Sequence, residues 1–320
     1  MRVSTNLLYS QKMNGVFGAQ SKWMRYGEQL SSGKRVINPS DDPLAASQNI
    51  VTSQSESQNQ QFAMARIFAK NTMSTQLSTI SSVVSVTHSV LETLVAAADE
   101  QSDHDRASYA QQLDGLKQQL LNLSNKTDGD GRYIFAGYKT DKPPFNADSN
   151  GKVTYEGGDQ AISQRVDDNR SMIIAHTGKD VFLSATSNPI KEPDGKASES
   201  NIFASIDYAI EALRKPFTDA SQAEKDAALE QINKANRGVR NSLNNFSSAE
   251  AVLGLQLQEM DNLDDLSRER SVANKVRMGE LVDVDWLSTI SDYYQEQASL
   301  QASYKAFADL KGMSLFEVYR

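Results

Sequence analysis

The sequence of 320 residues contains no cysteine, which excludes a disulfide framework and a thiolate metal site. Histidine occurs only three times, and His88, His104 and His176 are widely separated, so neither a zinc site nor a nucleophilic triad is indicated. Asp128 and Asp130 begin a calcium-loop pattern that lacks its later acidic residues and closing glutamate. The sequence therefore predicts no catalytic residues, no metal and no cofactor, and hence a protein that is not an enzyme.

An excess of positive charge is also missing, with 33 basic against 41 acidic residues and a pI near 5.1. Such a chain is a poor candidate for binding nucleic acid phosphates. The apolar runs are too short to cross a membrane, so we expect no membrane partner. Leu7 and Leu8 are followed at once by polar residues, unlike the apolar core of a signal peptide. These features alone predict a cytoplasmic protein.

Proline is scarce, and none of the seven prolines lies between Pro43 and Pro143. Apolar residues recur at helical spacing through residues 1–32, about 44–126, about 221–279 and from about 283 onward. The second region is expected to break near residues 102–105, which resemble a helix cap. The sequence predicts a mainly α fold built on long helices.

The stretch from Leu30 to Ser47 contains the first helix boundary. Gly33 can adopt the left-handed conformation that closes a helix, and Pro39 cannot continue one. Asp42 is a suitable N-cap for a helix whose first residue is Pro43. We call residues 33–43 the joint. The joint carries a basic pair, Lys34 and Arg35, shortly before the acidic pair Asp41 and Asp42.

Both ends of the chain show heptad spacing, which is typical of paired helices. Weaker rungs, Gln20, Gly27 and Gln297, interrupt the two apolar ladders. The ladder residues are Tyr9, Met13, Val16, Trp23 and Leu30 near the start, and Trp286, Ile290, Tyr293, Leu300, Tyr304 and Phe307 near the end. Residues 1–40 hold six basic residues and one acidic residue, whereas residues 283–320 hold six acidic and three basic residues. The ends can therefore pair with each other, although each could instead dock on its own domain.

A β-rich insertion is expected at residues 141–199, which are rich in Gly, Asp, Asn and Pro. Strands are predicted at 132–138, 153–156, 171–175 and 180–183. The predicted domains are a terminal coiled coil (1–40 with 284–320), a helical bundle (41–140 with 200–283) and the insertion. We expect the insertion to project outward, so that replacing residues 146–196 by a linker leaves the rest folded.

Two motifs carry a resemblance to a known family. The run LSSGKRVINPSDDP, followed by a small-residue helix, resembles the N-terminal signature of the flagellin superfamily. The run GRYIFAGYKTDKPPF, at residues 131–145, adds a second similarity at the expected distance. Pro39, Pro43 and the aromatic C-terminus (residues 315–320) are more similar to the hook–filament junction branch of the superfamily than to filament flagellin.

This resemblance implies a structural protein of the bacterial flagellum. The terminal helices are then expected to pair into a long antiparallel coiled coil and to stack with those of neighbouring subunits into an inner tube. The implied partners are other copies in a ring, hook-associated protein 1, flagellin, and an export chaperone at the C-terminal helix. Export through the flagellar type III apparatus without a cleaved signal would place the protein outside the cell. Filament flagellin, or a soluble coiled-coil adaptor, are the alternatives.

The expected assembly interface combines the two ladders with the charged residues of the joint. Asp42 is expected to cap its own helix, leaving Asp41 free to pair with Lys34 or Arg35 of another subunit. Because the terminal ladders are interrupted, we expect residues 1–40 and 284–320 to be disordered in the free subunit and to order on assembly.

Overall fold

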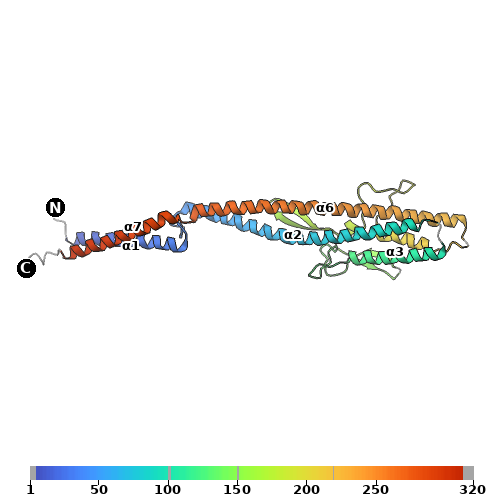
Figure 1. Cartoon of the computed structure of the whole chain (residues 1–320), viewed down its shortest axis with the longest axis horizontal. Coiled ribbons are helices and arrows are strands. Elements are labelled where there is room, and N and C mark those ends of the chain that lie inside the picture. The colour runs from blue at the N-terminus through green and yellow to red at the C-terminus, as the bar shows by residue number, and fades with distance from the viewer. Residues whose placement is uncertain (1–4, 100–101, 150, 219, 313–320) are drawn as a thin grey trace, which may run out of the picture. The chain divides into compact units, whose positions relative to one another are not determined.

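The computed structural model describes residues 5–99, 102–149, 151–218 and 220–312 (Figure 1). The helices are α1 (Thr5–Ser32), α2 (Pro43–Ala96), α3 (Asp103–Ser124), α4 (Gly178–Phe182), α5 (Ile202–Leu213), α6 (Gln222–Val282) and α7 (Trp286–Gly312). The strands are β1 (Phe145–Ala147), β2 (Val153–Tyr155), β3 (Ile162–Asp167) and β4 (Arg170–Ala175). This architecture confirms the predicted mainly α fold with a β-rich insertion.

Local capping chemistry sets the helix boundaries. Gly33 has a φ of +71° directly after α1, and α2 begins at Pro43, as expected. The predicted break after α2 is confirmed, because the Ser102 side chain accepts a hydrogen bond from the Asp105 N–H at the start of α3. The short-range signals of the sequence therefore located these boundaries.

The chain forms two compact units. Unit 1 comprises Met1–Gln60 and Arg268–Arg320, and unit 2 comprises Gln61–Ser267. The division falls inside the long helices α2 and α6, rather than at residues 40 and 284, where the sequence led us to expect it. No local sequence signal marks these positions, because both helices continue through them.

The insertion contains two antiparallel hairpins, β1–β2 and β3–β4. The predicted strands at 153–156 and 171–175 correspond to β2 and β4. The predicted strand at 132–138 is wrong, because this segment consists of turns, with positive φ at Gly131 and Gly137. Residues 180–183 overlap α4, which Thr177 caps, and are therefore not a strand either. The sequence reading missed β3, whose residues alternate between exposed and less exposed positions.

The core of unit 2 joins the insertion to the helices. The ring of Phe182 lies 5.1 Å from Phe135, 5.3 Å from Phe145 and 5.4 Å from Phe246 of α6, between ring centroids. Phe145 also contacts Phe203 of α5 at 5.6 Å. Because these rings belong to one continuous core, residues 141–199 do not form a hydrophobic core of their own.

Charged groups also attach the insertion to the long helices of unit 2. Arg66 of α2 is 1% exposed and bonds to Asp264 of α6 at 2.6 Å. The same guanidinium donates to the main-chain carbonyl of Val166 in β3 at 2.9 Å. A buried charge needs such partners, so this contact fixes β3 against both helices.

One helix is long and apolar enough to resemble a membrane span. An 18-residue window of α2 has a mean hydropathy of 1.3, and 44% of it is buried inside the fold. A core helix passes the same test of length and composition, and α2 supplies Met73, Ile80, Val83, Val90 and Leu94 to the core. Core packing accounts for this composition.

Candidate assembly interface

The two ends of the chain pair with each other in unit 1. Helices α1 and α7 lie side by side and antiparallel, and Figure 1 shows them at the blue and red ends of the colour scale. The Tyr9 and Phe307 rings are 5.0 Å apart, and Trp23 and Tyr293 are 5.7 Å apart. Lys22 and Glu296 form an ion pair at 3.5 Å. The structure therefore favours pairing of the ends over separate docking.

The predicted ladder of α1 faces α7 along most of its length. Val16 is buried, and Met13, Trp23 and Leu30 are half-buried. Tyr9 remains 46% exposed despite its contact with Phe307. Ala19, which the sequence reading did not select, is also buried, because it lies three residues after Val16 on the same face.

On α7, the predicted ladder and the inward face only partly coincide. Three of its rungs, Tyr293, Leu300 and Phe307, are half-buried. The other three, Trp286, Ile290 and Tyr304, are 54%, 41% and 50% exposed. The face with reduced exposure instead follows the heptad positions Thr289, Tyr293, Glu296, Leu300, Ser303 and Phe307. Every second position of this inward face is polar: Thr289, Glu296 and Ser303. The apolar spacing in the sequence therefore indicated an adjacent stripe of the helix.

Helix α7 thus carries an outer stripe of large apolar side chains that stay 41–64% exposed. We define the outer stripe as Trp286, Ile290, Tyr294 and Tyr304. On α1, the apolar side chains of Leu7, Phe17 and Met24 are also exposed. A cluster of exposed aromatic and aliphatic side chains on a folded surface is typical of a protein contact site.

The backbone of the joint is attached to the turn between α6 and α7. Lys34 and Asp283 form an antiparallel bridge. The Val284 N–H donates to the Gly33 carbonyl at 3.0 Å, and the Arg35 N–H donates to the Val282 carbonyl at 2.7 Å. A small apolar cluster of Val36, Ala45 and Val282 closes this region. The joint is therefore a bonded part of unit 1.

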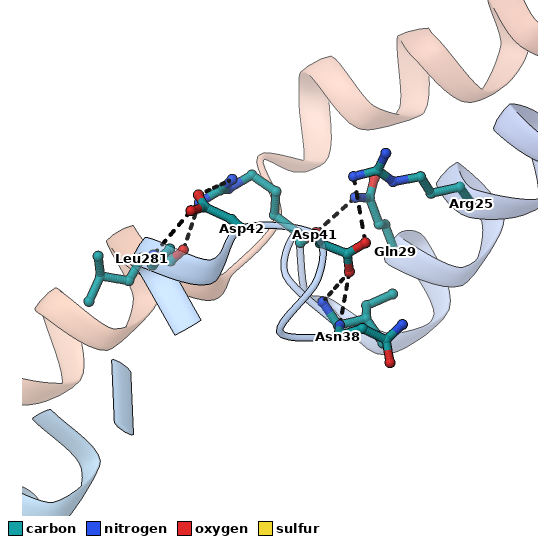
Figure 2. Close-up of polar contacts among 9 residues, drawn as sticks. Arg25, Gln29, Asn38, Asp41, Asp42 and Leu281 are labelled. Carbon is teal, nitrogen blue, oxygen red and sulfur yellow. Dashed lines mark hydrogen bonds and ion pairs between the residues drawn. The ribbon is translucent and has the colours of Figure 1, made fainter. Parts of the chain in front are cut away.

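Side chains extend this attachment, and Figure 2 shows Asp42 and Leu281 at this contact. Arg35 bonds to the Asp42 carboxylate at 3.2 Å and to the Leu281 carbonyl at 2.8 Å. Asp42 also accepts from the Ala45 N–H at 3.1 Å, which confirms its predicted role as the N-cap of α2. The Ala45 N–H, followed by Arg35, lowers the pKa of Asp42.

Asp41, which was expected to be free for another subunit, already has bonding partners within its own joint. Its carboxylate accepts from the Asn38 N–H at 2.9 Å and the Ile37 N–H at 3.2 Å, and Arg25 lies 3.9 Å away (Figure 2). The Asn38 N–H is the main group that lowers the pKa of Asp41. A short turn brings these N–H groups to the side chain, as is common for aspartate. The side chain of Lys34 is exposed.

The remaining candidates for chemistry have structural surroundings. Asp128 accepts from the N–H groups of Asp130 and Arg132, as in a simple turn. His88 and His104 are exposed. Among the residues that the structure describes, no cluster of three or more His, Asp or Glu side chains could hold a metal ion.

Comparison with known proteins identifies the family. The model of the bacterial flagellin N-terminal helical region matches residues 3–140. The flagellar hook-associated protein 3 of Escherichia coli (strain K12) is 51% identical over 319 residues, covering 99% of both chains. The protein of the same name from Salmonella typhimurium is 50% identical over 321 residues, covering 100% of both chains.

Solved structures share the fold at lower identity. FlgL of Xanthomonas campestris superimposes with a TM-score of 0.61 at 18% identity, covering 71% of this chain and 99% of that one. The hook-associated protein 3 of Legionella pneumophila has a TM-score of 0.64 at 17% identity, covering 72% of this chain and 98% of that one. Together with the full-length relatives, these similarities show that the chain belongs to the flagellar hook-associated protein 3 family.

Proposed function

We propose that this chain is a structural subunit of the bacterial flagellum that assembles at the hook–filament junction. The observation that carries this proposal is about 50% identity, over essentially the whole chain, to two proteins named flagellar hook-associated protein 3. Similarity over the full length includes both terminal helices, the joint and the insertion. It therefore favours the junction role over the alternatives of filament flagellin and a soluble coiled-coil adaptor.

The proposed partners are further copies of the chain in a ring, the neighbouring hook-associated protein 1, and flagellin. The outer stripe of α7, together with Phe17 and Met24 of α1, supports a contact with neighbouring subunits. The inward rungs, such as Val16, Tyr293 and Leu300, support the α1–α7 pair within one subunit. Most of the α1 ladder residues, which were expected to contact other subunits, are therefore proposed to contact α7 of the same subunit.

We also propose that the subunit is exported through the flagellar type III apparatus without cleavage, and that an export chaperone holds the C-terminal helix beforehand. The exposed apolar surface of α7 supports a need for such masking. Replacing the exposed residues Trp286 and Tyr304 with Ser is expected to weaken chaperone binding, because both positions lose a large apolar side chain. Unchanged affinity by calorimetry would place the chaperone site elsewhere.

The proposed role is mechanical and requires neither catalysis nor a cofactor. Immunogold electron microscopy of intact flagella tests the location. Label confined to the boundary between hook and filament is the expected result. Label distributed along the filament would support the flagellin alternative, and label absent from flagella would support the soluble adaptor.

A further inference from the structure

His176 differs from the two other histidines of the chain by its burial. It follows β4 and precedes Thr177, the N-cap of α4. Its Nε2 atom is shielded from solvent and has no hydrogen-bond partner among the described residues. A protonated imidazole must donate from both ring nitrogens, so this environment suits only the neutral ring.

The backbone of His176 is held by a buried amide from α2. The Gln76 side chain is fully buried and accepts from the His176 N–H at 3.0 Å. Its amide group donates to the His176 carbonyl at 3.1 Å and to the Ile134 carbonyl at 3.2 Å. One side chain thus attaches the end of β4, and the turn at residue 134, to α2.

The residues around this attachment leave little space for adjustment. The Gly178 N–H donates to the Phe135 carbonyl at 2.7 Å. A Cβ atom at Gly178 would lie 2.5 Å from the Phe145 ring and 2.8 Å from the Tyr155 ring. Protonation would leave the shielded Nε2–H of His176 without an acceptor, so the ring or its backbone must then move. A movement of the backbone breaks the bonds to Gln76.

Among the described residues, the acidic group that acts on His176 is Asp180, and it only partly offsets the cost of burying a charge. Asp180 of α4 is the acidic neighbour, but its carboxylate is exposed and accepts from the Thr177 hydroxyl at 2.8 Å. Burial raises the pKa of Tyr155 on β2 to about 12, so this group stays neutral. The side chain of α2 that bonds to His176, Gln76, is an uncharged amide. Asn245 of α6, which donates to the Asp180 and Val181 carbonyls, is also uncharged. Burial lowers the pKa of His176, and Asp180 offsets this only in part.

We propose that His176 and Gln76 form an acid-sensitive latch, in which protonation of His176 releases the β4–α4 segment from α2. The latch is closed at neutral pH, when the imidazole is uncharged. Below the ordinary histidine pKa of about 6.5 the opened state takes up a proton that the closed state excludes. The equilibrium constant for opening then rises up to about tenfold for each unit by which the pH falls. This continues until the pH reaches the pKa of the closed state.

The chain offers matched controls, because His88 and His104 are exposed. The test is urea unfolding of the full-length protein between pH 8 and pH 5, for the wild type and for His176→Gln, His88→Gln and His104→Gln. The wild type and both controls should lose stability below about pH 6.5, whereas His176→Gln should lose much less. Equal pH dependence in all four proteins would overturn the latch.

Two measurements on the wild-type protein keep the test decisive if His176→Gln does not fold. Proton NMR should show the ring of His176 titrating below the ordinary histidine pKa of about 6.5. Hydrogen exchange, corrected for the intrinsic pH dependence of exchange, should show residues 170–182 losing protection at pH 5 while α6 keeps it. A His176 ring that titrates at the ordinary histidine pKa, or a uniform loss of protection, would contradict the proposal.

Discussion

Asp41 and Asp42 are adjacent in the sequence, but their carboxylates bond to different parts of the joint. Asp42 caps α2 and holds Arg35, whereas Asp41 closes the turn at Ile37 and Asn38. Both carboxylates therefore stabilise the free subunit. In the free subunit, Asp41 is therefore not an unbonded charge.

Asp42→Ala and Asp41→Lys should each lower the melting temperature of unit 1, by roughly 2–4 °C, as expected for the loss of a cap or a turn contact. The pKa of each carboxyl lies below its ordinary value of 3.8, so the stabilisation is present above that pH and is lost as the pH falls through the lower value. Calorimetry between pH 7 and pH 2 measures both effects.

Asp41→Asn is the matched control, because it keeps one oxygen that can accept from the main chain. It should retain part of the stability that Asp41→Lys loses. If Asp41→Lys leaves the melting temperature unchanged, Asp41 does not stabilise the free subunit. That result would support an ion pair between Asp41 and another subunit instead.

At the scale of single elements, helix α7 has two distinct faces. The apolar ladder predicted from the sequence contained residues from both of them. The inward face contacts α1, and the outer stripe remains available. Leu300→Ser with Phe307→Ser should therefore destabilise the α1–α7 pair in the free subunit. Each loss of a half-buried apolar side chain should cost about 1 kcal/mol. Circular dichroism during thermal unfolding measures this loss.

Ile290→Ser with Tyr294→Ser is the matched pair on the outer stripe. It should lower the melting temperature of the free subunit less than Leu300→Ser with Phe307→Ser does, yet impair attachment of filaments in cells. Filament retention under shear, counted by electron microscopy, measures the effect. Normal retention by cells with this variant would exclude the outer stripe from the intersubunit contact.

The insertion is a second element whose role differs from the expectation. Replacing residues 146–196 with a Gly/Ser linker would remove Val166, Met172, Val181 and Phe182 from the shared core. Losing one large core side chain typically costs about 2–5 kcal/mol, and several such losses exceed the roughly 5–15 kcal/mol that stabilise a domain. Unit 2 should therefore fail to fold, with loss of the helical signal in circular dichroism.

Replacing only residues 193–196 with Gly-Gly is the control for this deletion. These residues form an exposed turn, and removing them leaves the aromatic cluster intact. The control should keep the helical signal. A folded protein after the complete replacement would restore the expectation of an independent outward domain.

At the scale of the whole molecule, the two units differ in how much they bury. In the described parts of α1 and α7, only Val16, Ala19, Gln29 and Thr289 are fully buried, whereas unit 2 contains a large aromatic and aliphatic core. A pair of helices with so little burial is marginal by itself. We therefore expect α1 and α7 to open more readily than unit 2 in the free subunit.

Limited proteolysis of the free subunit tests this difference. Both ends should be trimmed early, leaving a resistant fragment near residues 45–280, and assembly into flagella should protect the ends. Strong amide-exchange protection of α1 and α7 in dilute monomer would show that the pair is stable before assembly.

The sequence by itself determined the features that depend on short-range chemistry. Gly33, Pro43 and Ser102 mark helix boundaries because capping and φ preferences act within one helical turn. The motifs around residues 30–43 and 131–145 indicated the superfamily for the same reason, since each is a contiguous run. Heptad spacing and opposite charge made pairing of the chain ends possible, and the resemblance to the superfamily favoured it over separate docking.

Only the tertiary structure decided which stripe of α7 faces α1, that the insertion shares the core of unit 2, and that Asp41 is bonded within the joint. Each outcome depends on the rotation and position of one element relative to another that lies far away in the sequence. Several apolar stripes of a helix satisfy the same spacing rule, and the packing of both partners together selects one. Phe182 is buried because the rings of Phe145, Phe203 and Phe246 pack against it. The local sequence around residue 182 does not predict these contacts.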